Sequence, residues 1–190
     1  MRIGMVFGLI MLTAAAVAVP APSSPAPSTS PAPASDPAVA RLQRLSGAAF
    51  DVGFAQALIP VDEETVEMAM TATLYADHSE LLRWNQTVVE RKNEQIRKLL
   101  AWLQEAGATP AERRAGVATA SVKKLRTLRG PALERTYMSL MTTQLNQAVA
   151  LGRLASSKAS KLEIREFASG IVRSETHDTA MLHGWLQQWK

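Results

Sequence analysis

The sequence contains no cysteine and only three histidines among its 190 residues. The absence of cysteine excludes disulfides, cysteine metal sites and a lipid anchor attached through a cysteine. With so few histidines and no thiol, the chain offers little material for an activated nucleophile, and hydrolytic triads lack support. No glutamate is followed by a histidine three residues later, which excludes the Glu-x-x-His pattern of di-iron bundles.

Strand-like alternation of apolar and polar residues is also missing over any useful length. Apolar residues instead recur at three- and four-residue steps, which indicates amphipathic helices. Breaks in this pattern predict helices over about 36–45, 48–75, 79–105, 132–156 and 161–189. A further helical segment is expected between Thr109-Pro110 and about Leu128. Two αα-hairpins with short turns predict an all-α fold, an antiparallel four-helix bundle.

The first 36 residues differ in composition from the rest of the chain. Residues 1–18 combine an arginine, an apolar run and a small-residue cleavage site, the layout of a secretory signal peptide. Residues 19–36 are rich in proline, alanine and serine and predict an extended linker. The folded part is then one domain over 37–190 in a secreted or periplasmic protein. The alternative is an uncleaved apolar segment that anchors the chain in a membrane.

Charge is distributed unevenly along the folded part. Residues 40–106 carry 7 basic and 10 acidic side chains, a balance of −3, and residues 107–190 carry 13 and 6, a balance of +7. A basic surplus can indicate a nucleic-acid partner. The export signal argues against such a partner, and we expect the acidic and basic halves to attract each other within one fold.

The chain repeats itself at a constant offset of 83 residues, without a gap, from 50–104 to 133–187. Trp102-Leu103-Gln104 falls on Trp185-Leu186-Gln187, and many other positions exchange like for like. A constant offset over this length indicates an internal duplication of a two-helix unit.

Each repeat also carries a predicted helix start of the same kind. Asp77 with Glu80, and Ser160 with Glu163, have the spacing of a capping box. Because the two boxes lie at the same 83-residue offset, they strengthen the interpretation as a duplication.

The stretch FDVGFAQALIPVDEETVEMA, residues 50–69, followed by a helix that ends in Trp-Leu, resembles the "domain of unknown function 305" family. The first repeat matches the family pattern at Asp51, Phe54, Ile59, Pro60, Met68, Ala69, Ile96, Trp102 and Leu103. The second repeat approximates it at Glu134, Tyr137, Met141, Ala148, Glu175, Asp178, Trp185 and Leu186. The resemblance implies a ferritin-like helical bundle, often secreted, with copper binding or tolerance in some members through inward histidines and methionines.

The chain departs from this family pattern at the positions that the resemblance links to metal. The family's His-His pair is replaced by Val61-Asp62 in the first repeat and by Gln144-Leu145 in the second. The methionine of the second helix becomes Leu99 and Leu182, and its glutamine becomes Lys92 and Glu175. Of the metal-friendly side chains, Met68 and Met141 remain.

Candidate metal ligands remain in two places. The interior set comprises Asp62, Met68, Met141, Gln144 and Glu175. It mixes hard and soft donors, and the nearby Lys92 would repel a cation, so the alternative is that its methionines are core filler. The surface set is His177 and Met181, which share a helix face but lie off the apolar seam of their helix. The alternative for this set is a pair of ordinary surface residues.

Lys92 and Glu175 occupy equivalent positions of the two repeats, each on an apolar helix face. In a bundle with approximate twofold symmetry, equivalent positions lie near the axis. We therefore expect Lys92 and Glu175 to approach each other in the interior, with Asp62 and Gln144 as neighbours. Such a pair would satisfy the requirement that a buried charge be paired or neutralised.

These patterns leave two functions open, neither of them enzymatic. The first is a secreted or periplasmic bundle linked to copper or other metal binding, or to stress handling, with a degenerate metal site. The second is a metal-free structural or protein-interaction module tethered to the envelope. The expected partners are a metal ion, with copper as the candidate, or an unidentified protein. No nucleic acid is expected, and membrane contact only through an uncleaved N-terminal segment.

Overall fold

The structure, a computed structural model, describes residues 36–111 and 117–189. These residues contain no strand and six helices: α1 (Pro37–Gln43), α2 (Gly47–Thr73), α3 (Ser79–Glu105), α4 (Ala120–Arg126), α5 (Gly130–Lys158) and α6 (Leu162–Gln188). The expected all-α class is confirmed. The predicted signal peptide and nearly all of the predicted linker lie outside the described residues. None of the described helices has the length and apolar character needed to cross a membrane.

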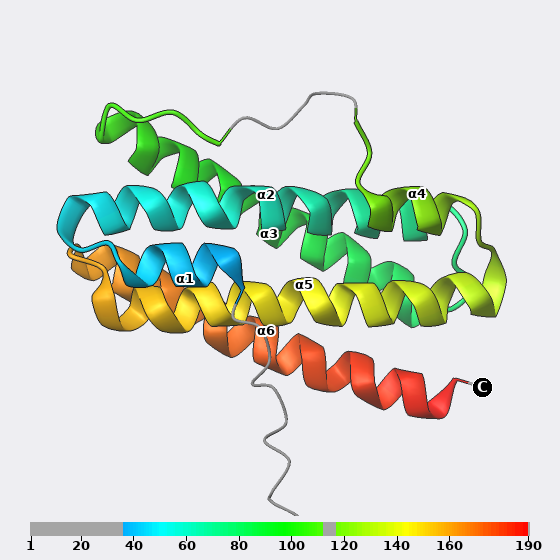
Figure 1. The fold of residues 1–190 in the computed structure, drawn as a ribbon. Helices are drawn as coiled ribbons and strands as arrows, with labels where there is room; N and C mark the ends of the chain where they lie inside the picture. Colours follow the sequence, from blue (N-terminus) through cyan, green and yellow to red (C-terminus); the bar gives the residue numbers. More distant parts are fainter. Residues whose placement is uncertain (1–35, 112–116, 190) are drawn as a thin grey trace, which may run out of the picture. The chain divides into compact units, whose positions relative to one another are not determined.

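The four long helices form a helical bundle (Figure 1). α2 packs against α3 and α5 against α6, each pair antiparallel, and the two hairpins meet through α2 and α5 (Figure 1). The short helices α1 and α4 both contact α2 and α5. Within the described residues, α3 and α6 are not among the pairs whose backbones pack closely. α3 and α6 contact each other through side chains, as in the T-shaped pairs Trp84–Trp185 and Trp102–Phe167.

Helix bounds recur at the 83-residue offset noted in the sequence. α3 covers 79–105 and α6 covers 162–188, and α2 and α5 begin at Gly47 and Gly130. Both of these glycines have a positive φ, 58° and 54°, a backbone conformation that favours glycine. Corresponding helices of the two hairpins thus begin in the same way.

α3 ends in a Schellman motif, as the glycine at 107 predicts. The Ala108 N–H donates to the Leu103 carbonyl at 2.8 Å, and the Gly107 N–H donates to the Gln104 carbonyl at 3.0 Å. Gly107 supplies the left-handed residue that this geometry needs, with a φ of 63°.

The start of α3 differs from the prediction. His78, not Asp77, is the N-cap residue, and no side chain caps the helix locally. A carboxylate from the other hairpin takes over this role, because Glu134 Oε1 on α5 accepts the backbone N–H groups of Asp77 and His78, each at 2.8 Å. The predicted Asp77 cap was wrong because the acceptor comes from a residue distant in sequence.

The start of α6 differs in the same manner. Lys161, not Ser160, is the N-cap residue, again without a local side-chain cap. Asp51 on α2 accepts the backbone N–H of Ser160 at 2.8 Å and that of Lys161 at 3.4 Å, and it also binds the Ser160 hydroxyl. Asp51 and Glu134 are themselves 83 residues apart, so each hairpin caps the second helix of the other.

The segment before α5 is less helical than predicted. α4 covers only Ala120–Arg126, whereas residues 108–111 and 117–119 are not helical. Thr119 begins α4 as its N-cap, because its hydroxyl accepts the Val122 N–H at 3.3 Å. Among the described residues of this segment, the expected connecting helix is present only as this short, capped helix.

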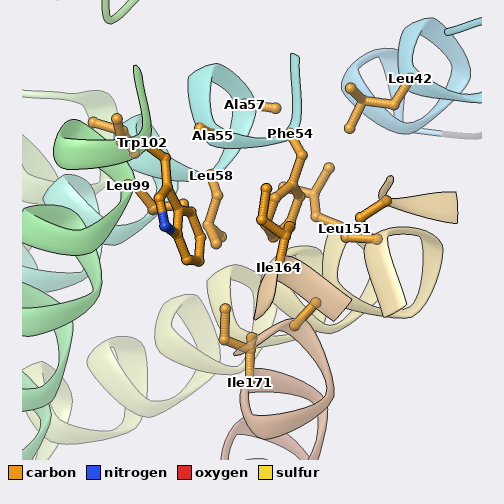
Figure 2. Close-up of a cluster of buried hydrophobic side chains, with 14 of the residues drawn as sticks. Leu42, Phe54, Ala55, Ala57, Leu58, Leu99, Trp102, Leu151, Ile164 and Ile171 are labelled. Carbon is orange, nitrogen blue, oxygen red and sulfur yellow. The ribbon is translucent and has the colours of Figure 1, made fainter. Parts of the chain in front are cut away.

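Buried apolar side chains form two separate clusters. Figure 2 shows the first, in which Phe54 and Leu58 of α2 lie near Trp102 of α3 and Ile164 of α6. The second cluster uses the opposite halves of the same helices and includes Met68, Leu81, Val88, Tyr137, Met141 and Leu182. The candidate functional site lies between these two clusters.

Candidate functional site

A layer of buried charged residues comes from the middle of α2, α3 and α6. Lys92 and Glu175 stand at the centre of the 27-residue helices α3 and α6, and both are fully buried. Lys92 Nζ lies 2.8 Å from Asp62 Oδ1 and 2.9 Å from Glu175 Oε1. The structure therefore brings the lysine between two carboxylates. We call this trio, together with Arg91 and Asp178, the buried ion-pair cluster.

Arg91 and Asp178 form the outer part of this cluster. The Arg91 guanidinium pairs with Asp178, and its Nη2 lies 3.9 Å from Glu175 Oε2. The Arg91 side chain is 26% exposed, whereas that of Asp178 is 6% exposed, so the cluster reaches solvent along Arg91. When every group is ionised, three carboxylates face two cations, and the buried layer carries a charge of −1.

Several oxygens of this layer have no hydrogen-bond partner among the described residues. They are buried and include Asp62 Oδ2 and Glu175 Oε2. Glu175 Oε1 approaches the Lys92 ammonium as an ion pair without hydrogen-bond geometry. Because unpartnered buried oxygens are costly, the ammonium is the main compensation for both carboxylates.

Burial and pairing act in opposite directions on the pKa values of the cluster. Burial raises the pKa of Asp62 from 3.8 to about 6, although the neighbouring Lys92 ammonium acts to lower it. For Lys92, burial alone would lower the pKa, but Asp62 and Glu175 together outweigh this effect and raise it above 10.5. Lys92 therefore stays an ammonium, whereas the raised pKa makes Asp62 easier to protonate than an ordinary aspartate.

The other interior candidates are not among the groups that pair with Lys92. Met68 and Met141 are fully buried in the second apolar cluster, among apolar and aromatic neighbours. Gln144 on α5 is half-buried, with an Oε1 that has no hydrogen-bond partner among the described residues. The methionines thus have the surroundings of core filler.

The two surface candidates differ in exposure. His177 is exposed on α6, and Met181 is half-buried against the second apolar cluster. His183 is exposed as well. A side chain that packs on the core is only partly free to coordinate an ion, so this pair is at most a weak, open site.

Copper, which the family resemblance implies, does not fit the buried ion-pair cluster. The described buried residues include no histidine, and the three buried thioethers, those of Met68, Met138 and Met141, lie in an apolar cluster. Between the carboxylates stands an ammonium, which repels a cation and competes for the same oxygens. No group of three or more histidine, cysteine, aspartate or glutamate side chains in the described residues has an arrangement that could hold a metal ion.

A second polar cluster lies at the turn between α2 and α3. His78 Nδ1 lies 2.6 Å from Glu134 Oε2, and the imidazole stacks on Trp189 with a centroid separation of 4.0 Å. Trp189 stacks in turn on Trp185 at 4.9 Å. These contacts hold the end of α6 against the turn, so His78 has a structural role there. Trp189 is half-buried rather than free at the surface.

Sequence reasoning missed Arg91 as a member of the ion-pair cluster. The sequence pointed to Asp178 as a buried polar residue, because it follows Glu175 by three positions on the same apolar helix face. Arg91 carried none, because it lies next to Lys92 in a strongly charged stretch of α3 and its partner is 87 residues away. Only the packing of α3 opposite α6 brings the two together.

Fold and cluster together define the class of protein, a four-helix bundle with an ion-pair layer between two apolar cores. The family described as "Domain of unknown function (DUF305)" matches residues 13–103 and 134–190, and the chain belongs to this family. The resemblance seen in the sequence is thereby confirmed. Among curated proteins, none matches the sequence significantly.

Solved structures of the same fold include proteins of this family. A DUF305 protein of Streptomyces coelicolor, described as secreted, is 23% identical and aligns with a TM-score of 0.67 over 73% of this chain and 91% of its own. CopM in its Cu(II)-bound form is 19% identical, with a TM-score of 0.65 over 74% of this chain and 98% of its own. A DUF305 fragment of Deinococcus radiodurans is 20% identical, with a TM-score of 0.65 over 73% and 95%. At these identities the likeness shows the fold.

Proposed function

We propose that this chain is a non-enzymatic helical-bundle module that works outside the cytoplasm without a copper ion in its interior. The observation that carries the proposal is the Lys92 ammonium, which lies 2.8 Å and 2.9 Å from the carboxylates of Asp62 and Glu175. The bundle thus carries its own positive charge at its centre. The proposal corresponds to the metal-free alternative of the sequence analysis.

The comparison with CopM sharpens this proposal. CopM has the same fold and has been obtained in Cu(II)-bound and Cu(I)-bound forms. Copper ions favour imidazole and thioether ligands. In this chain the three histidines are not among the buried residues, and Met68 and Met141 are enclosed by apolar side chains. The fold is kept, whereas no imidazole is buried with the thioethers of Met68, Met138 and Met141.

Two further observations support the remaining parts of the proposal. A location outside the cytoplasm agrees with the signal-peptide layout of residues 1–18 and with the Streptomyces coelicolor neighbour described as secreted. A non-enzymatic role agrees with the state of the histidines. His78 is engaged by Glu134 and Trp189, and His177 and His183 stand exposed on one helix. The proline-rich segment would serve as the tether.

Titration calorimetry with Cu(I) under anaerobic conditions, and separately with Cu(II), tests the proposal on the protein without its signal peptide. CopM serves as the positive control. We expect no tight stoichiometric binding, and any weak binding should disappear in His177→Ala and persist in Met68→Ala and Met141→Ala. Tight one-to-one binding that is lost in Met68→Ala or Met141→Ala would overturn the proposal. Circular dichroism of each variant checks that a lost signal does not reflect unfolding.

A further inference from the structure

We propose that the space between Asp62 and Glu175 is a cation site for which Lys92 supplies a built-in ammonium, and that without this side chain the site takes a hard divalent cation. The inference rests on the contacts of the buried ion-pair cluster and not on the location of the protein. In the native chain the site is filled by the protein itself, so the bundle needs no ion from solution.

The geometry around Lys92 Nζ is that of a bound cation. Two carboxylates from different helices, α2 and α6, approach it at 2.8 Å and 2.9 Å. All three side chains are fully buried. Two more oxygens of the site, Asp62 Oδ2 and Glu175 Oε2, are buried and lack a hydrogen-bond partner among the described residues. The site therefore offers four carboxylate oxygens, of which the ammonium contacts two.

The charges of the cluster indicate the valence of the replacement. Arg91 is engaged by Asp178 and also lies 3.9 Å from Glu175 Oε2, so removal of Lys92 removes the ion pair of Asp62 and one of the two ion pairs of Glu175. The charge of the layer then changes from −1 to −2. A divalent cation restores neutrality, whereas a monovalent cation leaves a buried charge uncompensated. The missing lysine side chain also leaves the space into which an ion can enter.

The donor atoms indicate the chemical class of the cation. The oxygens at the site are carboxylate oxygens, which suit hard cations such as Mn²⁺, Ca²⁺ and Mg²⁺. The three buried thioethers, those of Met68, Met138 and Met141, are not among the groups that pair with Lys92. A soft cation therefore has no advantage at this position, and Mn²⁺ is the most useful probe because its free hexaaqua form has a strong paramagnetic resonance signal.

Binding of Mn²⁺ by Lys92→Ala, compared with Lys98→Ala, tests the proposal. Lys98 stands on the same helix, and its Nζ lies 3.8 Å from Glu94 Oε1 in an exposed pair, so its removal is a matched loss of one lysine. At pH 8, we expect Lys92→Ala to quench the resonance signal of one Mn²⁺ per chain. Millimolar Mn²⁺ should also raise the Tm of this variant by at least 5 °C. The wild type and Lys98→Ala should show neither effect.

A second variant locates the ion and keeps the test decisive. The double change Lys92→Ala with Glu175→Gln removes one carboxylate and should abolish the Mn²⁺ response. If Lys92→Ala is unfolded without metal, Mn²⁺ should restore its helical circular dichroism. The proposal is overturned if neither signal loss nor Tm shift nor refolding occurs at 5 mM Mn²⁺. It is also overturned if the wild type or the double variant binds Mn²⁺ equally well. The copper titration of the wild type is independent of all these outcomes.

Discussion

Protonation of Asp62 should stabilise the folded bundle in mild acid relative to neutral pH. Burial raises the pKa of this carboxyl to about 6 in the folded chain, against an ordinary value of 3.8 that applies to the unfolded chain. Between these two values the folded state binds the proton and the unfolded state does not. Stability from this group is therefore complete below pH 3.8 and is lost as the pH rises through 6. Lys92 keeps its second partner, Glu175, when Asp62 is neutral.

The size of the effect follows from the two pKa values. Their difference, at 1.36 kcal/mol for each pKa unit, corresponds to about 3 kcal/mol of unfolding free energy. Over the accessible range from pH 7.5 to pH 4, about 2 to 3 kcal/mol of this should appear. The full amount applies because Asp62 is completely buried and water does not screen its charge.

Asp62→Asn isolates this contribution because asparagine resembles the protonated acid and does not titrate. Urea unfolding followed by tryptophan fluorescence gives the unfolding free energy of both proteins at a series of pH values. The wild type should gain about 2 to 3 kcal/mol relative to Asp62→Asn as the pH falls from 7.5 to 4. Glu94→Gln, an exposed carboxylate on α3, is the control and should follow the wild type within about 0.5 kcal/mol. Parallel curves for the wild type and Asp62→Asn would refute the reasoning.

Two further predictions concern contacts that join the hairpins. Asp51→Ala and Glu134→Ala should each lower the unfolding free energy by about 1.5 to 3 kcal/mol in urea, because backbone N–H groups at a helix start lose a charged acceptor. A loss below about 0.5 kcal/mol in both would show that these contacts contribute nothing. Tyr137→Phe should cost about 1 to 3 kcal/mol, since the Tyr137 hydroxyl donates to Asn85 Oδ1 at 2.6 Å in the interior. The half-buried Tyr75→Phe is its control, and an equal effect of the two changes would contradict the assignment.

Much of the fold was predictable because it is written in local patterns. Apolar residues at helical spacing located α2, α3, α5 and α6 to within about two residues at each end. Gly107 marked the end of α3, since only a residue that tolerates a positive φ fits the motif found there. The connecting segment before α5 was overestimated, because composition favours a helix there but the Thr119 cap begins one only at 120.

The helix starts show why local patterns are not enough. A capping box is a local signal, yet α3 and α6 take their acceptors from Glu134 and Asp51, which lie 56 and 109 residues from His78 and Ser160. The backbone N–H groups need an acceptor, but its source is free to be any carboxylate that packing brings close. What the two helix starts share is therefore an acceptor carboxylate from the other hairpin, at the same 83-residue offset, and not a local capping box.

The sequence by itself determined the helices, the family and the polar character of the bundle centre. Periodicity placed Lys92 and Glu175 on apolar faces, and elementary electrostatics required them to be paired there. Only the tertiary structure decided the partners. It set the Lys92 ammonium between Asp62 and Glu175, joined Arg91 to Asp178 and left Met68 and Met141 among apolar side chains. The reason is that periodicity tells which face of a helix is buried, whereas ion pairing depends on which helices become neighbours and how far apart they lie.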